Sequence, residues 1–142
     1  MRPPFLRDSL SEHALAGGGN GTFSPTLLIV DDDAHMLQAL GCYFARRSFN
    51  VATARTVGEA KDVFAQQKLW TLVISDYHLP DGTGMELKAW LEAQPGGAPP
   101  FLLMSGSIQG SAAALGLDFL AKPFALADLE GRLRILLRGH SG

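Results

Sequence analysis

Cysteine is the scarcest informative residue in this chain, and long apolar runs are missing as well. Cys42 is the single cysteine among 142 residues, so neither an internal disulfide nor a CxxC metal or redox site can form. This points to a reducing compartment, and we expect a cytoplasmic protein. No stretch approaches the roughly 20 apolar residues that a membrane span requires, and the N-terminus has no apolar run of signal-peptide length.

The chain also carries little net charge. Lys and Arg total 12, Asp and Glu total 14, and the formal net charge is -2. This balance lacks the basic excess that binding to nucleic acid or to an anionic membrane requires, so we expect direct binding to neither. In contrast, 46% of the residues are hydrophobic, which suffices for a packed core, and the length suits one domain.

The two ends of the chain differ from its middle. Residues 1–25 are rich in glycine and proline and predict a flexible N-terminal tail. The GGGNG run at 17–21 follows no strand and contains no lysine, which favours a linker over a phosphate-binding loop. A regular pattern then predicts one domain over 26–138, followed by a short C-terminal tail at 139–142.

Short apolar runs alternate with segments of helical periodicity. The apolar runs predict strands at 26–30, 50–54, 69–75, 101–104 and 118–121. The periodic segments predict helices at 34–47, 57–68, around 85–91 and at 126–137, with a further short helix within 108–115. Strands that alternate with helices predict an α/β fold, in which right-handed crossovers place helices on both faces of a parallel sheet.

Polar side chains follow four of the predicted strands. Asp31 and Asp32 follow the first strand and Asp76 the third, while Ser105 ends the fourth and Lys122 follows the fifth. In open parallel sheets, ligands bind outside the carboxyl ends of the strands, where the strand order reverses. We therefore expect these five side chains to converge at one edge of the domain.

Three carboxylates at one place repel one another unless a cation lies between them. A hard divalent cation such as Mg²⁺ suits an oxygen-only site, and Lys122 and Ser105 are suitable groups for holding a phosphoryl group. Taken singly, an aspartate after a strand is more often a turn residue or a helix N-cap, and we expect Asp33 to be one. Five suitable residues at successive strand ends favour a functional site.

Four segments of the chain resemble the motifs of response-regulator receiver domains of two-component signalling. They are VDD at 30–32, SDYHLPDGTG at 75–84, MSG at 104–106 and KPF at 122–124, and the resemblance covers about residues 26–138. It implies a doubly wound, flavodoxin-like sheet of five parallel strands in the order 2-1-3-4-5. It also implies a stand-alone phosphoacceptor of a phosphorelay, similar to chemotaxis regulators, that is a signalling module rather than an enzyme.

The resemblance also implies a role for each site residue. Asp76 would accept a phosphoryl group from a phosphohistidine on a sensor histidine kinase or a phosphotransfer protein. Asp31 and Asp32 would hold Mg²⁺ together with a side-chain oxygen of Asp76 and the backbone carbonyl of His78. Lys122 would pair with a phosphoryl oxygen, and the peptide bond between Lys122 and Pro123 would be cis.

The remaining implied parts concern switching. The Ser105 hydroxyl would move toward the new phosphoryl group, and Phe119 matches the family's switch aromatic, although core packing explains Phe119 almost as well. The switch would change a surface that binds a downstream protein target. The interval from Ser105 to Lys122 is about one helical turn shorter than is usual in the family, which predicts a shortened fourth helix.

Three other residues have simpler interpretations. We expect Gly82 and Gly84 to be turn residues that need permissive backbone dihedral angles. Cys42 falls within a predicted helix, where we expect an inert, buried or half-buried side chain.

Two alternative functions remain open at this point. A phosphatase similar to haloacid dehalogenases also places an Asp-x-Asp after its first strand, and would use Asp31, Asp33, Ser105 and Lys122, but it leaves Asp76 unexplained. The other alternative is a receiver-like interaction module that is never phosphorylated. The complete set of three aspartates, a serine and a lysine speaks against that alternative.

Overall fold

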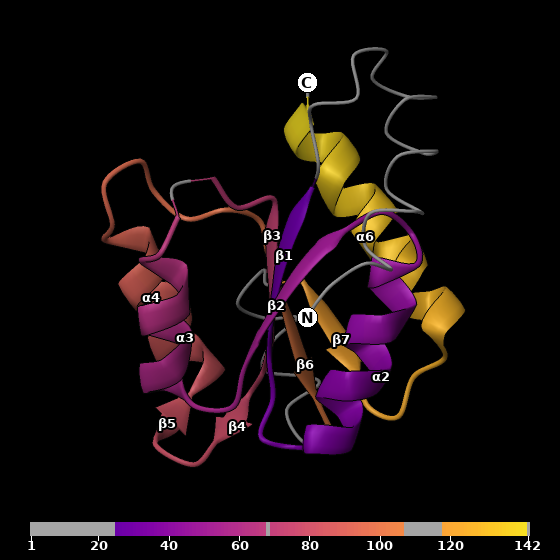
Figure 1. Cartoon of the computed structure of the whole chain (residues 1–142), viewed down its shortest axis with the longest axis horizontal. Helices are drawn as coiled ribbons and strands as arrows, with labels where there is room; N and C mark the ends of the chain where they lie inside the picture. The colour runs from indigo at the N-terminus through magenta and orange to yellow at the C-terminus, as the bar shows by residue number, and fades with distance from the viewer. Residues whose placement is uncertain (1–24, 68, 107–117, 142) are drawn as a thin grey trace.

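The computed structural model describes residues 25–67, 69–106 and 118–141, with side chains as far as residue 137 (Figure 1). In chain order, its elements are β1 Thr26–Val30, α2 Ala34–Ala45, β2 Asn50–Ala54, α3 Val57–Phe64, β3 Leu72–Asp76, β4 His78–Leu79, β5 Gly82–Thr83, α4 Gly84–Glu92, β6 Phe101–Ser105, β7 Phe119–Ala121 and α6 Leu126–Ser141. No helix in these ranges is both long and apolar enough to cross a membrane.

The five main strands form one parallel sheet in the order β2-β1-β3-β6-β7. This order, with its reversal between β1 and β3, is the predicted doubly wound arrangement. The register aligns the carboxyl ends of neighbouring strands, since Val30 pairs with Ala54 and Ser75, and Asp76 pairs with Met104. Residues that follow these strands therefore emerge at one edge of the sheet.

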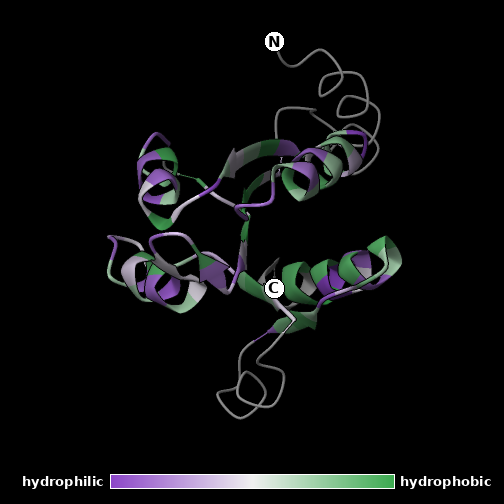
Figure 2. Cartoon of the chain, turned by 90° about the horizontal axis from the view of Figure 1, so that it is seen from below, coloured by the Kyte–Doolittle hydropathy of each residue, from purple (hydrophilic) through white to green (hydrophobic). Residues whose placement is uncertain are grey.

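Helices cover both faces of the sheet, and each face has its own core. Seen from below, apolar strands stand between two layers of helices that carry both polar and apolar residues (Figure 2). Successive residues of β1 point to opposite faces. Leu27 and Ile29 pack with the buried leucines of α2 and α6, whereas Leu28 and Val30 pack with α3 and α4. Burial on both faces explains why the strands read as continuous apolar runs.

Helix α3 and strand β3 are both shorter than predicted. The helix ends at Phe64 instead of residue 68, and the strand begins at Leu72 instead of residue 69. The Trp70 indole N–H donates to the Phe64 carbonyl at 3.0 Å, and the two rings stack with their centroids 5.6 Å apart. These contacts end the helix and leave Leu69 82% exposed, outside the strand.

Other differences lie at the surface and at the ends of elements. The sequence did not predict the small antiparallel hairpin of β4 and β5 that follows β3. Helix α6 extends to Ser141, which takes in most of the expected C-terminal tail. Cys42 is exposed rather than buried, because it lies on the side of α2 that faces away from the sheet. The N-terminal tail, the helix expected within 108–115 and its predicted shortening fall outside the described residues.

Gly84 is required for lack of space, and neither it nor Gly82 has the unusual dihedral angles that were expected of turn glycines. Neither has a positive φ, in contrast to Gly96 and Gly97 in the connection after α4. A Cβ on Gly84 would lie 2.5 Å from the backbone carbonyl oxygen of Asp76 and 2.8 Å from a methyl carbon of Leu103. The first turn of α4 thus packs directly against the end of β3.

This close approach makes Gly84 sensitive to a single added methyl group. We expect Gly84→Ala to lower the free energy of unfolding by about 2 kcal/mol, because the backbone oxygen that it meets cannot move aside as a side chain can. The matched control is Gly131→Ala in α6, where a Cβ would meet nothing within 4 Å. That variant should gain about 0.5–1 kcal/mol from helix propensity. Urea unfolding measures both, and equal stabilities would contradict the packing of α4 against β3.

Candidate functional site

The predicted site residues meet at the carboxyl edge of the sheet. Backbone hydrogen bonds hold each one in place at its strand end: the Asp31 N–H donates to the Ala54 carbonyl at 3.0 Å, and the Lys122 N–H donates to the Ser105 carbonyl at 2.9 Å. Asp76 is itself the last residue of β3, the middle strand of the sheet. Asp76 and Ser105 thus belong to the sheet itself, while Asp31 and Lys122 directly follow a strand and are tied to the neighbouring strand by a backbone hydrogen bond.

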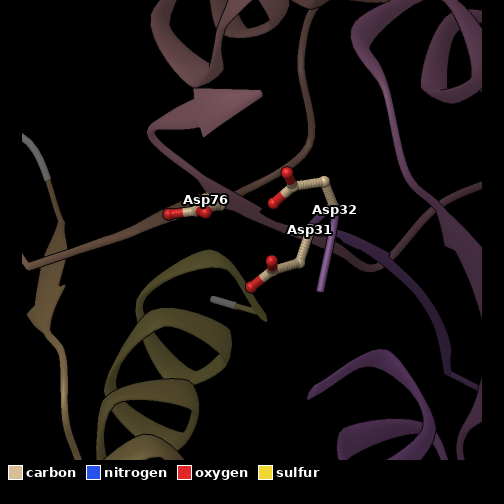
Figure 3. Close-up of side chains that lie close together, drawn as sticks. All are labelled: Asp31, Asp32 and Asp76. Atoms are coloured by element: carbon tan, nitrogen blue, oxygen red, sulfur yellow. The ribbon is translucent and has the colours of Figure 1, made fainter. Parts of the chain in front are cut away.

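Three carboxylates form what we call the acid cluster: Asp31, Asp32 and Asp76. Each contributes one oxygen, and these three oxygens lie within 4.8 Å of one another (Figure 3). Their environments differ, since Asp31 is buried, Asp76 is partly buried and Asp32 is exposed. A set of carboxylate oxygens that opens to solvent on one side fits a hard divalent cation that keeps some of its water ligands.

Lys122 partly neutralises the acid cluster. Its Nζ lies 2.9 Å from an Oδ2 oxygen of Asp31 and 3.5 Å from the Oδ2 oxygen of Asp76. Burial lowers the pKa of Lys122, but the hydrogen bond that Lys122 donates to Asp31 and the charges of both aspartates outweigh this effect and raise the pKa above its usual value. The ammonium group therefore stays charged between the two carboxylates.

The electrostatics of Asp76 reflect its partly buried position. Burial raises the pKa of Asp76 above its ordinary range; Lys122 opposes this shift, and the negative charge of Asp31 adds to it. The carboxylate form of Asp76 is therefore harder to maintain than that of an exposed aspartate. A bound cation would remove this penalty, because opposite charge at short range favours the ionised form.

Asp33 does not belong to the acid cluster. Its side chain accepts hydrogen bonds from the backbone N–H groups of His35 and Met36, at 3.0 and 3.2 Å, and so caps α2 as predicted. Its own N–H donates to Asp31 at 2.9 Å. This contact orients Asp31, whose other oxygen faces Lys122. The alternative of a phosphatase similar to haloacid dehalogenases requires Asp33 to face the site. The role of Asp33 as the cap of α2 argues against that alternative.

Ser105, Phe119 and His78, the other predicted site residues, lie at different places in the fold. Ser105 is buried at the end of β6, and Phe119 is half-buried in β7, where it pairs with Leu103 and packs on the α3 and α4 side of the sheet. The peptide bond between Lys122 and Pro123 is cis, as expected. His78 is exposed in β4, and its ring lies edge-on to that of Tyr77.

Sequence reasoning missed two residues beside the site. Asp81, at the turn of the β4–β5 hairpin, accepts hydrogen bonds from the N–H groups of Val57 and Gly58 at 2.7 and 2.9 Å. It therefore ties the hairpin to the start of α3. Arg55 donates from its Nη2 to the backbone carbonyl of Asp32 at 3.2 Å. Each contact joins segments more than 20 residues apart, and no local pattern signals such a pair.

Comparison with known proteins gives consistent results. The family model described as "Response regulator receiver domain" matches residues 27–134. The transcriptional regulatory protein GltR of Pseudomonas aeruginosa is 29% identical over 80% of this chain and 49% of its own length. The transcriptional regulatory protein BasR of Escherichia coli is 33% identical over 81% of this chain and 53% of its own. The chain thus spans about half the length of these relatives.

Solved structures give the same picture. A putative response regulator from Chloroflexus aurantiacus is 30% identical, with a TM-score of 0.72 over 82% of this chain and 99% of that one. The non-phosphorylated HemR receiver domain from Leptospira biflexa is 27% identical, with a TM-score of 0.71 over 80% of this chain and 94% of that one. Structures of whole receiver domains thus match most of this chain.

The Asp81 anchor gives a test of the site's framework. The Gly58 and Val57 N–H groups hold the pKa of Asp81 below its usual range. Its contribution to stability is therefore present at neutral pH and lost as the pH falls below about 4. We expect Asp81→Asn to lower the thermal midpoint at pH 7, and we expect this difference to shrink toward pH 3. Asp62→Asn is the control, because Asp62 is exposed on α3, the helix to which Asp81 is bonded. A loss of thermal midpoint in Asp81→Asn that does not change with pH would contradict the anchor.

Proposed function

Since the chain belongs to the family of response regulator receiver domains, we propose that Asp76 is the residue that accepts its phosphoryl group. The donor would be a phosphohistidine on a sensor histidine kinase or a phosphotransfer protein. The observation that carries this proposal is the position of Asp76 at the end of the middle strand, with Lys122 at 3.5 Å and two further carboxylates beside it.

The transfer itself needs one nucleophile and no protein acid or base. An oxygen of the Asp76 carboxylate attacks phosphorus, the phosphorus–nitrogen bond to the donor imidazole breaks, and the imidazole leaves with the electron pair and takes up a proton from water. The product is an acyl phosphate on Asp76, a recognised form of covalent catalysis by carboxylates. Lys122 would donate to a phosphoryl oxygen, because its ammonium group already faces Asp76.

Asp31, Asp32 and Asp76 would hold Mg²⁺, together with the backbone carbonyl of His78. Their oxygen-only donor set fits this ion, and the exposure of Asp32 leaves the site open on one side. When bound, the ion neutralises negative charge on the phosphoryl oxygens and on the carboxylates. The hairpin that contains His78 is held against α3 by Asp81, which would keep the carbonyl in place.

Ser105 and Phe119 would change position in response to phosphorylation of Asp76. Ser105 ends the strand next to Asp76, so its hydroxyl would donate to a phosphoryl oxygen after a short movement. Phe119 pairs with Leu103 on that same strand, and its half-buried ring would repack as β6 shifts. The expected result is a population shift that changes the surface near β7 and α6 and alters binding of a downstream protein.

The full regulatory role extends beyond the acceptor reaction. GltR and BasR are described as transcriptional regulatory proteins, and this chain matches about half of each. We infer that this receiver domain acts through contacts with proteins, and that any control of transcription passes through such a contact rather than through binding of DNA by the domain itself. Its near-neutral charge supports this inference.

Replacement of Asp76 tests the acceptor. Wild type, incubated with Mg²⁺ and radiolabelled acetyl phosphate or a phosphorylated cognate kinase, should gain one acid-stable, base-labile phosphoryl group per chain. Asp76→Asn should gain none, because the amide is not a nucleophile, whereas Asp62→Asn should match wild type. Equal labelling of Asp76→Asn would refute the assignment. A wild type that is not labelled, and that also fails to bind beryllofluoride in the presence of Mg²⁺, would favour the receiver-like interaction module that is never phosphorylated.

Replacement of Asp32 tests the metal site separately. Asp32→Asn removes one charged ligand and should weaken Mg²⁺ binding by about tenfold or more, because affinity depends on the charge of the ligands. Isothermal titration calorimetry on the unphosphorylated protein gives this affinity directly. Asp33→Asn is the matched control, since Asp33 caps α2 and should leave the affinity within about twofold. Similar affinities for wild type and Asp32→Asn would remove Asp32 from the metal site.

A further inference from the structure

Arg55 is a fixed cation at the rim of the acid cluster. It follows β2, and its guanidinium Nη2 donates to the backbone carbonyl of Asp32 at 3.2 Å. Its own backbone N–H donates to Glu59 Oε1 at 2.7 Å, which holds the start of the side chain. Arg55 is exposed, and within the described part of the chain it forms no ion pair with a carboxylate. Its charge and most of its five N–H donors are therefore available.

Arg55 also lines a hollow that adjoins the site. Arg55, Asp32, Thr56 and Pro80 line an open hollow with a volume of about 350 Å³. The walls come from the turns after β1 and β2 and from the β4–β5 hairpin, which lie together at the lower end of α3 in Figure 1. Asp81 holds the hairpin wall against α3. Since Asp32 belongs to both the hollow and the acid cluster, the hollow lies directly beside the carboxylates.

The negative charges at this edge repel an anionic phosphodonor, and the positive charge of Arg55 lies where it would reduce that repulsion. Every phosphodonor is an anion, and it must approach three carboxylates. Of the basic side chains that the structure describes, Lys122 and Arg55 are those within hydrogen-bond distance of these aspartates, and Lys122 is already engaged with Asp31 and Asp76. A guanidinium group matches phosphate and carboxylate oxygens well, because its planar fork can donate two parallel hydrogen bonds.

We propose that Arg55 and the hollow beside it form an anion-binding subsite for a small acyl phosphate that donates its phosphoryl group to Asp76. This inference rests on the proposed acceptor role of Asp76. An Asp76 oxygen bonds to phosphorus, the bond between phosphorus and the acyl oxygen breaks, and a carboxylate leaves with the electron pair and needs no proton. Arg55 raises the local concentration of the doubly charged donor through its charge.

The test separates the charge of Arg55 from its hydrogen bond to Asp32. Arg55→Lys keeps the charge, whereas Arg55→Gln keeps an N–H donor for the Asp32 carbonyl and removes the charge. Arg46→Gln, an exposed change at the far end of α2, is the control. The second-order rate constant of labelling by acetyl phosphate is measured with saturating Mg²⁺ at low ionic strength. Thermal midpoints and Mg²⁺ affinities of all variants are recorded alongside.

A single cation about 8 Å from a doubly charged donor changes its reaction rate about fivefold in water. We expect Arg55→Gln to label about fivefold more slowly than wild type, while Arg55→Lys and Arg46→Gln stay within about twofold. The effect should be smaller with phosphoramidate, which carries one net negative charge at neutral pH. It should also fade at an ionic strength near 1 M, where the screening length is about 3 Å.

Four results would overturn the subsite. Equal rates for wild type and Arg55→Gln would show that the charge has no role, and equal slowing of Arg55→Gln and Arg55→Lys would show that Arg55 acts only by positioning Asp32. A wild type that acetyl phosphate does not label, although a cognate kinase labels it on Asp76, would overturn the subsite and leave the acceptor intact. A wild type that no donor labels would overturn the acceptor and the subsite together.

Discussion

The ion pair between Lys122 and buried Asp31, at 2.9 Å, is the interaction on which the site depends. A buried carboxylate without a partner is strongly destabilising, so the pair needs both residues in place. Asp31 follows β1 and Lys122 follows β7, and β3 and β6 lie between these strands. The pair therefore spans the edge of the sheet above the end of β3, and this is where Asp76 lies.

The charge balance of the site follows from this pair. One ammonium group serves two carboxylates, and the exposed Asp32 adds a third negative charge, so the cluster retains an excess of negative charge. Burial and the nearby Asp31 raise the pKa of Asp76, against the opposing effect of Lys122. An added cation would offset this excess of negative charge and leave the site suited to an anion, as the proposed metal-assisted phosphoryl transfer would require.

Residue patterns with a local cause could be predicted well. The five strands, their order and the strand-end aspartates follow from apolar runs, from the family motifs and from the rule that parallel strands share a carboxyl edge. The cap formed by Asp33 was also predictable, because its donors lie two and three residues away. Errors arose where a distant residue intervened: Trp70 ended α3 early, and the backbone oxygen of Asp76, rather than a turn, dictated Gly84.

The sequence by itself determined which residues are buried in strands and helices and which polar groups stand at the strand ends, because periodicity and burial act on neighbours along the chain. Only the tertiary structure decided what surrounds those groups. Asp81 caps a helix that starts 24 residues earlier, and Arg55 bonds to a backbone carbonyl 23 residues away. Such contacts depend on how the connecting turns pack at the sheet edge, and nothing in the spacing of the residues encodes that packing.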